Sequence, residues 1–183
     1  MTQLDRRKKR AVKLVQPLGT MNIAIIPTAE PYFEGLRQVL DTVAREKQYL
    51  AFLQAPPAEE AFAFFRNIVA NNLCQVVALE EGTVVGWCDV LPTHGEARAH
   101  VGTLGIGLLP HARHRGIGSK LMEAAISRAW ENDFSRIELT VRTDNENAKA
   151  LYERFGFTVE GIQRRAMRVD GEFFDAYAMA LVR

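Results

Sequence analysis

The feature that most constrains the fold of this sequence is a glycine-bearing turn between an apolar run and an amphipathic helix. The apolar run covers Val101–Leu109, and the turn contains the segment RHRGIG at residues 113–118. Behind the turn, apolar and polar residues recur with a helical period. The apolar side comprises Leu121, Met122, Ala125, Ile126 and Ala129, and the polar side comprises Lys120, Glu123, Arg128 and Glu131. The pattern therefore predicts a strand, a tight turn and a helix in direct succession.

The start of this helix is suited to bind an anion. The first N–H groups of a helix lack intrahelical partners, and the helix dipole makes that end positive. Gly116 and Gly118 let backbone N–H groups approach a ligand without a Cβ atom in the way. The turn is not a P-loop, because no Gly-Lys-Ser/Thr closes it, and it lacks the Gly-x-Gly-x-x-Gly spacing of dinucleotide-binding turns. We therefore expect a diphosphate cradle, and the alternative is a plain strand-to-helix turn that needs glycine for its geometry.

Patterns along the rest of the chain indicate the element order β-α-α-β-β-β-α-β-α-β-β, without an internal repeat. The expected strands cover residues 22–27, 75–79, 84–91, 100–109, 136–141, 157–168 and 173–182. Pro31 marks the first turn of the first helix, which should turn Phe33, Leu36, Leu40 and Val43 toward the core. The second helix follows Pro57, with an expected core stripe of Ala61, Phe62, Phe65 and Val69.

Short polar signals predict the turns. Glu81-Gly82 and Asp170-Gly171 each indicate a β-hairpin. Thr143 and Glu146 have the spacing of a capping box for the last helix, and Gly156 is placed to end that helix with a left-handed cap. The segment at residues 48–57 is apolar without a clear period, which favours either core filler or the wall of a pocket.

Length and composition are those of an ordinary globular protein, which we expect to be cytoplasmic. A chain of 183 residues, with 48% hydrophobic and 25% charged residues, is long enough to bury a core. The net charge of +1 gives no reason to expect nucleic acid or a membrane surface as the main partner. No apolar run approaches the roughly 20 residues that span a bilayer. Cys74 and Cys88 lie in apolar runs, so we interpret them as reduced, buried thiols.

We divide the chain into a basic N-terminal extension, residues 1–20, and a single domain over residues 21–183. The extension carries a basic cluster at residues 6–10 and has no apolar periodicity. Such a cluster could bind nucleic acid or lipid. Without interleaved aromatic residues it is better interpreted as a solvated, partly mobile extension.

Two motifs together resemble those of the GNAT N-acetyltransferases. The first is Arg-x-x-Gly-x-Gly at residues 113–118, with His114 where many members have a further glycine. The second is Val-x-x-x-Asn-x-x-Ala-x-x-Leu-Tyr-x-x-x-Gly-Phe at residues 141–157. The resemblance covers residues 22–183, and the segment at residues 160–182 is closer to the amino-acid and small-amine acetyltransferases than to the histone-modifying ones. It implies a mixed α/β (α+β) domain, with a twisted, mostly antiparallel mixed sheet of about seven strands and about four flanking helices.

The resemblance implies an enzyme that transfers the acetyl group of acetyl-CoA to a primary amine by direct attack. It assigns the diphosphate to Arg113, His114, Arg115, Gly116, Ile117, Gly118 and Ser119, and the pantetheine arm to Leu108, Leu109, Asn145 and Ala148. It makes Tyr152, on the Asn145 face of its helix, the acid that protonates the departing sulfur. The alternative for Tyr152 is a core-edge residue whose hydroxyl reaches water.

The general base is less constrained. Some family members carry a glutamate on the fourth strand, where this sequence has Gly102. His100, two residues earlier on the same strand face, is our candidate base, and its alternative role is a strand-end residue facing solvent. Glu46, at the mouth of the apolar segment, is a second candidate. His111 and His114 have no accompanying Cys/His cluster, so we expect no metal.

We expect the acceptor to be a small primary amine with an apolar group, such as a hydrophobic amino acid. The candidate pocket wall is Tyr49, Leu50, Phe52 and Leu53, with Glu46 beside it, whereas a polyamine would require several carboxylates. The alternatives are a peptide or protein α-amine, or a module that binds acyl-CoA without catalysis. An NAD-dependent enzyme is disfavoured, because its glycine motif near the first strand is missing. We further hypothesise a homodimer.

Overall fold

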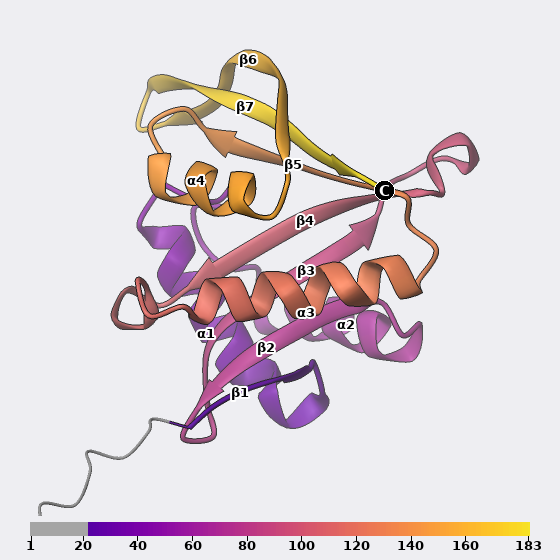
Figure 1. Ribbon diagram of the computed structural model, residues 1–183. Coiled ribbons are helices and arrows are strands. Elements are labelled where there is room, and N and C mark those ends of the chain that lie inside the picture. Colours follow the sequence, from indigo (N-terminus) through magenta and orange to yellow (C-terminus); the bar gives the residue numbers. More distant parts are fainter. Residues whose placement is uncertain (1–21) are drawn as a thin grey trace, which may run out of the picture.

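The structure, a computed structural model, describes residues 22–183 and has the predicted succession of elements (Figure 1). The basic extension and its cluster lie outside the described residues. The strands are β1 (Ile23–Pro27), β2 (Cys74–Glu80), β3 (Thr83–Pro92), β4 (Val101–Leu108), β5 (Arg136–Arg142), β6 (Thr158–Val169) and β7 (Glu172–Val182). The helices are α1 (Phe33–Arg45), α2 (Ala58–Ala70), α3 (Ile117–Glu131) and α4 (Glu146–Arg154), with short 3₁₀ turns at Glu30–Tyr32, Glu96–Arg98 and Pro110–Ala112. The predicted fold class is confirmed.

The seven strands form one sheet in the order β1-β2-β3-β4-β5-β7-β6. Neighbouring strands are antiparallel except β4 and β5, which are parallel because α3 carries the chain across one face of the sheet. These two strands pair only over Val101–Thr103 and Arg136–Glu138 and then diverge, as Figure 1 shows. Main-chain groups of the second half of β4 therefore face a gap instead of a partner strand.

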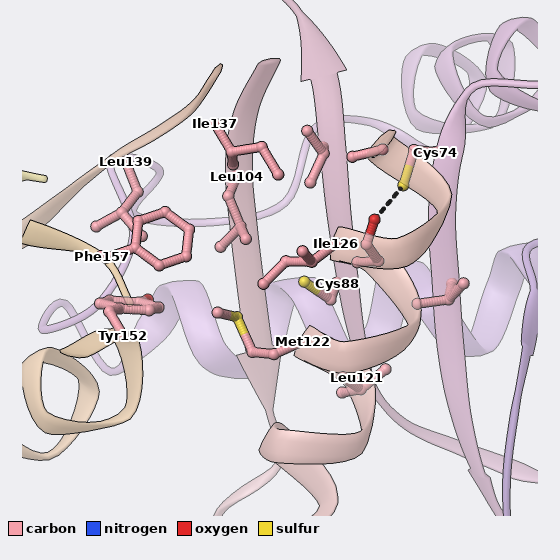
Figure 2. Close-up of a cluster of buried hydrophobic side chains, with 14 of the residues drawn as sticks. Cys74, Cys88, Leu104, Leu121, Met122, Ile126, Ile137, Leu139, Tyr152 and Phe157 are labelled. Atoms are coloured by element: carbon pink, nitrogen blue, oxygen red, sulfur yellow. Dashed lines mark hydrogen bonds between the residues drawn. The ribbon is translucent and has the colours of Figure 1, made fainter. Parts of the chain in front are cut away.

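Helices cover both faces of the sheet. Helix α3 crosses one face, and α1 and α2 lie on the other (Figure 1). Figure 2 shows Leu121, Met122 and Ile126 of α3 in a buried cluster with Leu104, Ile137, Leu139, Tyr152 and Phe157. All five apolar residues predicted to line α3 are buried, which confirms its predicted orientation. Because burial of one large aliphatic side chain contributes about 1.5–3 kcal/mol, this packing fixes the helix and the glycine turn before it.

The two hairpins and the helix end follow from local turn chemistry. Glu81-Gly82 joins β2 to β3 with φ angles of 51° and 83°, and Asp170-Gly171 joins β6 to β7 with 50° and 91°. These left-handed pairs have the twist that a two-residue hairpin turn requires. Gly156 follows α4 with a φ of 89°. All three predictions are confirmed.

Two predictions about helices are wrong. Helix α2 buries Ala61, Phe65 and Ile68, whereas the predicted Val69 is 47% exposed. Ile68, one position before Val69, therefore completes the buried face of the helix. The N-cap of α4 is not the predicted box.

At the start of α4, Asn145 is the N-cap, and its Oδ1 accepts a hydrogen bond of 3.2 Å from the Ala148 N–H. Thr143 lies in the turn directly after β5, where its N–H donates to the Asp175 carbonyl of β7 at 3.0 Å. The cap fixes the orientation of α4 relative to the end of β5.

Both cysteines are free and buried, as predicted. The Cys74 thiol donates to the Ala125 carbonyl at 3.1 Å, drawn as the dashed line in Figure 2. Burial raises the pKa of Cys74 to about 11 and also raises the pKa of Cys88, so both stay protonated. No helix within residues 22–183 has the length and apolar character needed to cross a bilayer.

Candidate active site

The divergence of β4 and β5 opens into a pocket of about 370 Å³. Its walls come from the end of β4, the glycine turn, the end of β5, helix α4 and the end of α1. The pocket brings together these residues predicted for the cofactor: Leu108, Arg113, His114, Gly116, Gly118, Ser119, Asn145, Ala148 and Tyr152. Residues more than 40 positions apart in the sequence thus face one cavity.

The glycine turn presents the start of α3 to this pocket. Gly116 is the N-cap of α3 and has a left-handed backbone with a φ of 77°. A Cβ atom added there would meet nothing within 4 Å, so the space in front of the turn is open. His114 also has a left-handed backbone, with a φ of 58°. Glycine adopts that conformation without strain, and histidine tolerates it better than bulky residues do.

Three predicted cofactor residues have side chains outside the pocket. Ile117, the first residue of α3, is buried in the core, and Leu109 packs against both apolar clusters. Arg115 forms an ion pair of 2.5 Å with Glu80. Their contribution to an anion site is limited to their backbone groups.

The Arg113 side chain is engaged with protein groups. Its guanidinium donates to both Glu46 carboxylate oxygens and, through Nε at 3.0 Å, to the Leu108 carbonyl. It also lies 4.8 Å from the centre of the Tyr49 ring. The pair with Glu46 raises the pKa of Arg113. Because both Glu46 oxygens accept hydrogen bonds from Arg113, this carboxylate is poorly placed to act as a base. Arg113 therefore ties the glycine turn to the end of α1, and Tyr49 closes the pocket beside it.

Tyr152 is buried and lines the pocket from α4. Its ring packs against Phe157 with centroids 6.0 Å apart, and Figure 2 shows both rings at the edge of the buried cluster. Burial raises the pKa of Tyr152 well above the usual value for a phenol. The hydroxyl is thus protonated at neutral pH and is able to donate a proton or a hydrogen bond into the pocket.

The structure does not bring His100 to this pocket. His100 lies exposed in the turn before β4, and its carbonyl accepts hydrogen bonds from the Ser135 and Arg136 N–H groups. Since a strand rises about 3.3 Å per residue, roughly 20 Å separate it from Ile106 at the pocket. The solvent-facing alternative for His100 is what the structure shows, and its assignment as base finds no support.

Gly102 stands where the resemblance would place a glutamate, and a side chain at this position requires its neighbours to shift. A Cβ atom there would collide with Val90 and touch Phe134 inside the core.

Among the described residues no group of three or more His, Cys, Asp or Glu side chains could hold a metal.

A second pocket, of about 400 Å³, lies on the face covered by α1 and α2. Its lining is mostly aliphatic and aromatic and includes Leu36, Leu40, Leu50, Phe52, Phe65, Trp87 and Leu91. Two residues of the predicted wall, Leu50 and Phe52, thus line it. Tyr49 lines the first pocket, and Leu53 is 43% exposed and lines neither.

The second pocket also contains Asp89, which sequence reasoning missed. Burial raises the pKa of Asp89 to about 6, although hydrogen bonds from Gln75, Gly105 and Trp87 lower it. The available signal was an acid inside an otherwise apolar strand, on the same face as Trp87 and Leu91. Asp89 is thus a carboxylate whose proton affinity is tuned close to neutral pH.

Comparison with known proteins gives concordant results. The sequence matches the Acetyltransferase (GNAT) family over residues 38–157. It is 33% identical to the L-amino acid N-acetyltransferase AaaT of Escherichia coli, over 82% of this chain and 92% of that protein. It is 35% identical to the N-alpha-acetyltransferase RimI of Mycobacterium tuberculosis, over 68% of this chain and 73% of that protein. The fold matches that of yncA from Salmonella typhimurium, solved with its cofactor acetyl-CoA, with a TM-score of 0.83 over 88% of this chain and 94% of that chain, at 15% identity.

Proposed function

The chain belongs to the GNAT acetyltransferase family and transfers the acetyl group of acetyl-CoA to an amine; we propose that this amine is the α-amino group of an amino acid with an apolar side chain. The observation that carries the proposal is the second pocket, whose aliphatic and aromatic lining adjoins the first pocket along β4. Such a lining favours an amine carried on an apolar body. The similarity to an L-amino acid N-acetyltransferase over most of both chains supports the same acceptor class.

The first pocket fits acetyl-CoA. The open space before Gly116 and the start of α3 would receive the diphosphate, and the free side of β4 at Ile106–Leu108 would pair with the pantetheine. Asn145 and Ala148 would form the opposite wall for the arm. When bound, acetyl-CoA supplies an activated acetyl thioester and a thiol leaving group.

Tyr152 is the acid in this proposal. Its raised pKa keeps the hydroxyl protonated until a partner accepts the proton. Sulfur departing into the same apolar surroundings is poorly solvated as a thiolate, so its proton affinity rises as well. Tyr152 can therefore deliver its proton, and donors on the free side of β4 can stabilise negative charge on the acetyl oxygen.

The acceptor is tested by following free thiol release with a panel of amines at equal concentration. We expect phenylalanine and methionine to react faster than spermidine, because the apolar pocket offers too few carboxylates to a polycation. Faster turnover of spermidine than of either amino acid would refute the proposal.

Two neighbouring side chains provide a matched pair for the same assay. Phe52→Ser removes an aromatic side chain that lines the second pocket, whereas Leu53→Ser alters a side chain outside it. We expect the first change to raise the KM for phenylalanine and the second to leave it unchanged. Equal effects would argue that this pocket does not hold the acceptor.

A peptide α-amine is the second candidate, supported by the 35% identity to an N-alpha-acetyltransferase. It presents the same ammonium group but needs room for the chain that follows. A short peptide belongs in the amine panel for this reason, and its preference over free amino acids would favour this candidate.

A cytoplasmic location and a homodimer remain predictions. Two free, buried thiols suit a reducing compartment. Light scattering of the purified protein measures the oligomeric state directly, and a monomer at micromolar concentration would contradict the dimer.

A further inference from the structure

The second pocket holds a carboxylate that the proposed mechanism has not used. Asp89 extends from β3 across the neighbouring strand β4, where it pairs with Gly105 in the strand register. A Cβ atom on Gly105 would stand 2.9 Å from Asp89 Oδ1, so a glycine at this position is what lets the carboxylate lie over β4. Its other oxygen, Oδ2, accepts a hydrogen bond of 3.1 Å from Gln75 Nε2.

A second acceptor lies beside this carboxylate. Gln75 is only 3% exposed, and its Oε1 has no hydrogen-bond partner among the described residues. Gln75 Nε2 already donates to the Asp89 carboxylate. Turning the amide around would instead place Oε1, an acceptor, against the carboxylate oxygen, which is also an acceptor. An unpaired buried acceptor costs about 1–3 kcal/mol, so this oxygen indicates a donor that the protein itself does not supply.

The charges around the pocket are negative. Asp89 and Glu60, which α2 contributes at the exposed edge, are its charged lining residues, and no basic side chain of the described chain lines it. Helix α1 contributes leucines, and β4 contributes Gly105. Two acceptors and a negative field in an apolar cavity match the chemistry of an ammonium group on an apolar body.

The two pockets meet along one strand. Gly105 lines the second pocket, and Gly107, two residues further on the same face of β4, lines the first, so the two pockets border one strand about 7 Å apart. The neighbouring residues Tyr49 and Leu50 likewise line different pockets, Tyr49 the first and Leu50 the second. A group bound at Asp89 would thus lie beside the part of the first pocket that borders β4, where the pantetheine would pair.

We propose that the second pocket binds the acceptor's α-ammonium group between Asp89 and Gln75 Oε1, and that Asp89 accepts one of its protons. This proposal rests on the proposed function. The neutral amine then forms a C–N bond to the acetyl carbon while the C–S bond breaks and its electron pair leaves with sulfur. Of the two protons lost from nitrogen, one passes through Asp89 to solvent. Tyr152 gives its own proton to sulfur, and the second proton lost from nitrogen restores the Tyr152 hydroxyl, so the products are the amide, the free thiol and one proton in solvent.

Burial makes this proton transfer feasible. An apolar site disfavours both the ammonium ion and the carboxylate, which lowers the pKa of the first and raises that of the second. The pKa of Asp89 is already about 6. Transfer converts an ion pair into two neutral groups, and this conversion is less unfavourable here than in water.

The test combines turnover with binding. In Asp89→Asn we expect kcat/KM for phenylalanine to fall about 10²–10⁴-fold, with acetyl-CoA affinity unchanged. Calorimetry in the presence of coenzyme A should show weaker phenylalanine binding in this variant. Asp133→Asn, which makes the same change at an exposed turn, should behave as wild type.

The pH profile separates a base from a packing residue. The wild-type kcat/KM should fall as the pH drops below about 6, where Asp89 becomes protonated. Gln75→Met removes the hydrogen bond that lowers the pKa of Asp89 most, so the acid limb of this variant should move to higher pH. This second variant also decides the matter if Asp89→Asn loses acetyl-CoA binding through misfolding.

The assignment of Asp89 would be overturned if Asp89→Asn kept the turnover and the pH profile of the wild type. It would also be overturned if the acid limb of Gln75→Met did not move. Failure of the wild-type protein to acetylate amino acids would instead refute the proposed function. The two failures are therefore distinguishable.

Discussion

Asp89→Asn should make the protein more stable at neutral pH, although we expect it to damage catalysis. Burial raises the pKa of Asp89 from 3.8 to about 6 in the folded chain. The folded chain therefore holds a proton between about pH 4 and pH 6 that the unfolded chain has lost. Raising the pH through this window costs the wild-type protein stability, and the cost is complete above pH 6 and absent below pH 4.

The size of the effect follows from the same pKa values. A difference of about two in pKa corresponds to about 3 kcal/mol, and we expect about 2 kcal/mol because the pocket admits some solvent. Asparagine at position 89 has no charge at any pH. The free energy of unfolding of the variant, minus that of the wild type, should therefore grow by about 2 kcal/mol from pH 4 to pH 7. For a chain of this length this is a rise in Tm of about 4–8 °C.

Urea unfolding of both proteins at pH 4, 5, 6 and 7 measures this difference, and other titrating groups cancel in it. Asp133→Asn, which makes the same change at an exposed turn, serves as the control. A constant difference for Asp89→Asn across the same range would refute the reasoning. It would mean that Asp89 is hydrated in the folded chain and titrates as in the unfolded one.

Three further changes test the first pocket. At Ser119, on the first turn of α3, glutamate should weaken coenzyme A binding about 10-fold or more relative to glutamine, because a like charge about 4 Å away costs about 1–4 kcal/mol; equal affinities by calorimetry would contradict the anion cradle. Tyr152→Phe should lower kcat about 10²–10⁴-fold with acetyl-CoA affinity unchanged, and full turnover would return Tyr152 to a packing role. His114→Gly should raise the free energy of unfolding in urea by up to about 1 kcal/mol, because glycine adopts the φ of 58° without strain; a loss of stability would contradict this.

Local chemistry made the order of elements predictable. The stripe of α3, the hairpins at Glu81-Gly82 and Asp170-Gly171, and the cap at Gly156 depend on residues that are neighbours in the chain. Helical and strand periods and left-handed turn positions are properties of such short segments, so they can be recognised without knowing the partner surfaces. The same holds for the glycine turn, whose strand, turn and helix are contiguous.

Long-range contacts decided what the site residues do. The sequence indicates an arginine beside an anion turn, but only the fold brings Glu46 to Arg113 and so occupies both side chains. Likewise, Asn145 instead of Thr143 caps α4, because the Thr143 N–H donates to the Asp175 carbonyl of β7. Each outcome depends on a partner at least 30 residues away, for which spacing in the sequence gives no signal.

The sequence by itself determined the family's two motifs and the scaffold that carries them, whereas only the tertiary structure decided which of the acidic and basic side chains lie in a pocket. The strand period places His100 on the same face as Gly102, but the opening between β4 and β5 begins only beyond Thr103 and leaves His100 at the far end. Asp89 looked like one polar residue in an apolar run. The role that we propose for Asp89 depends on the register that sets it against Gly105 and on the burial that raises its pKa, and both arise from packing between separate strands.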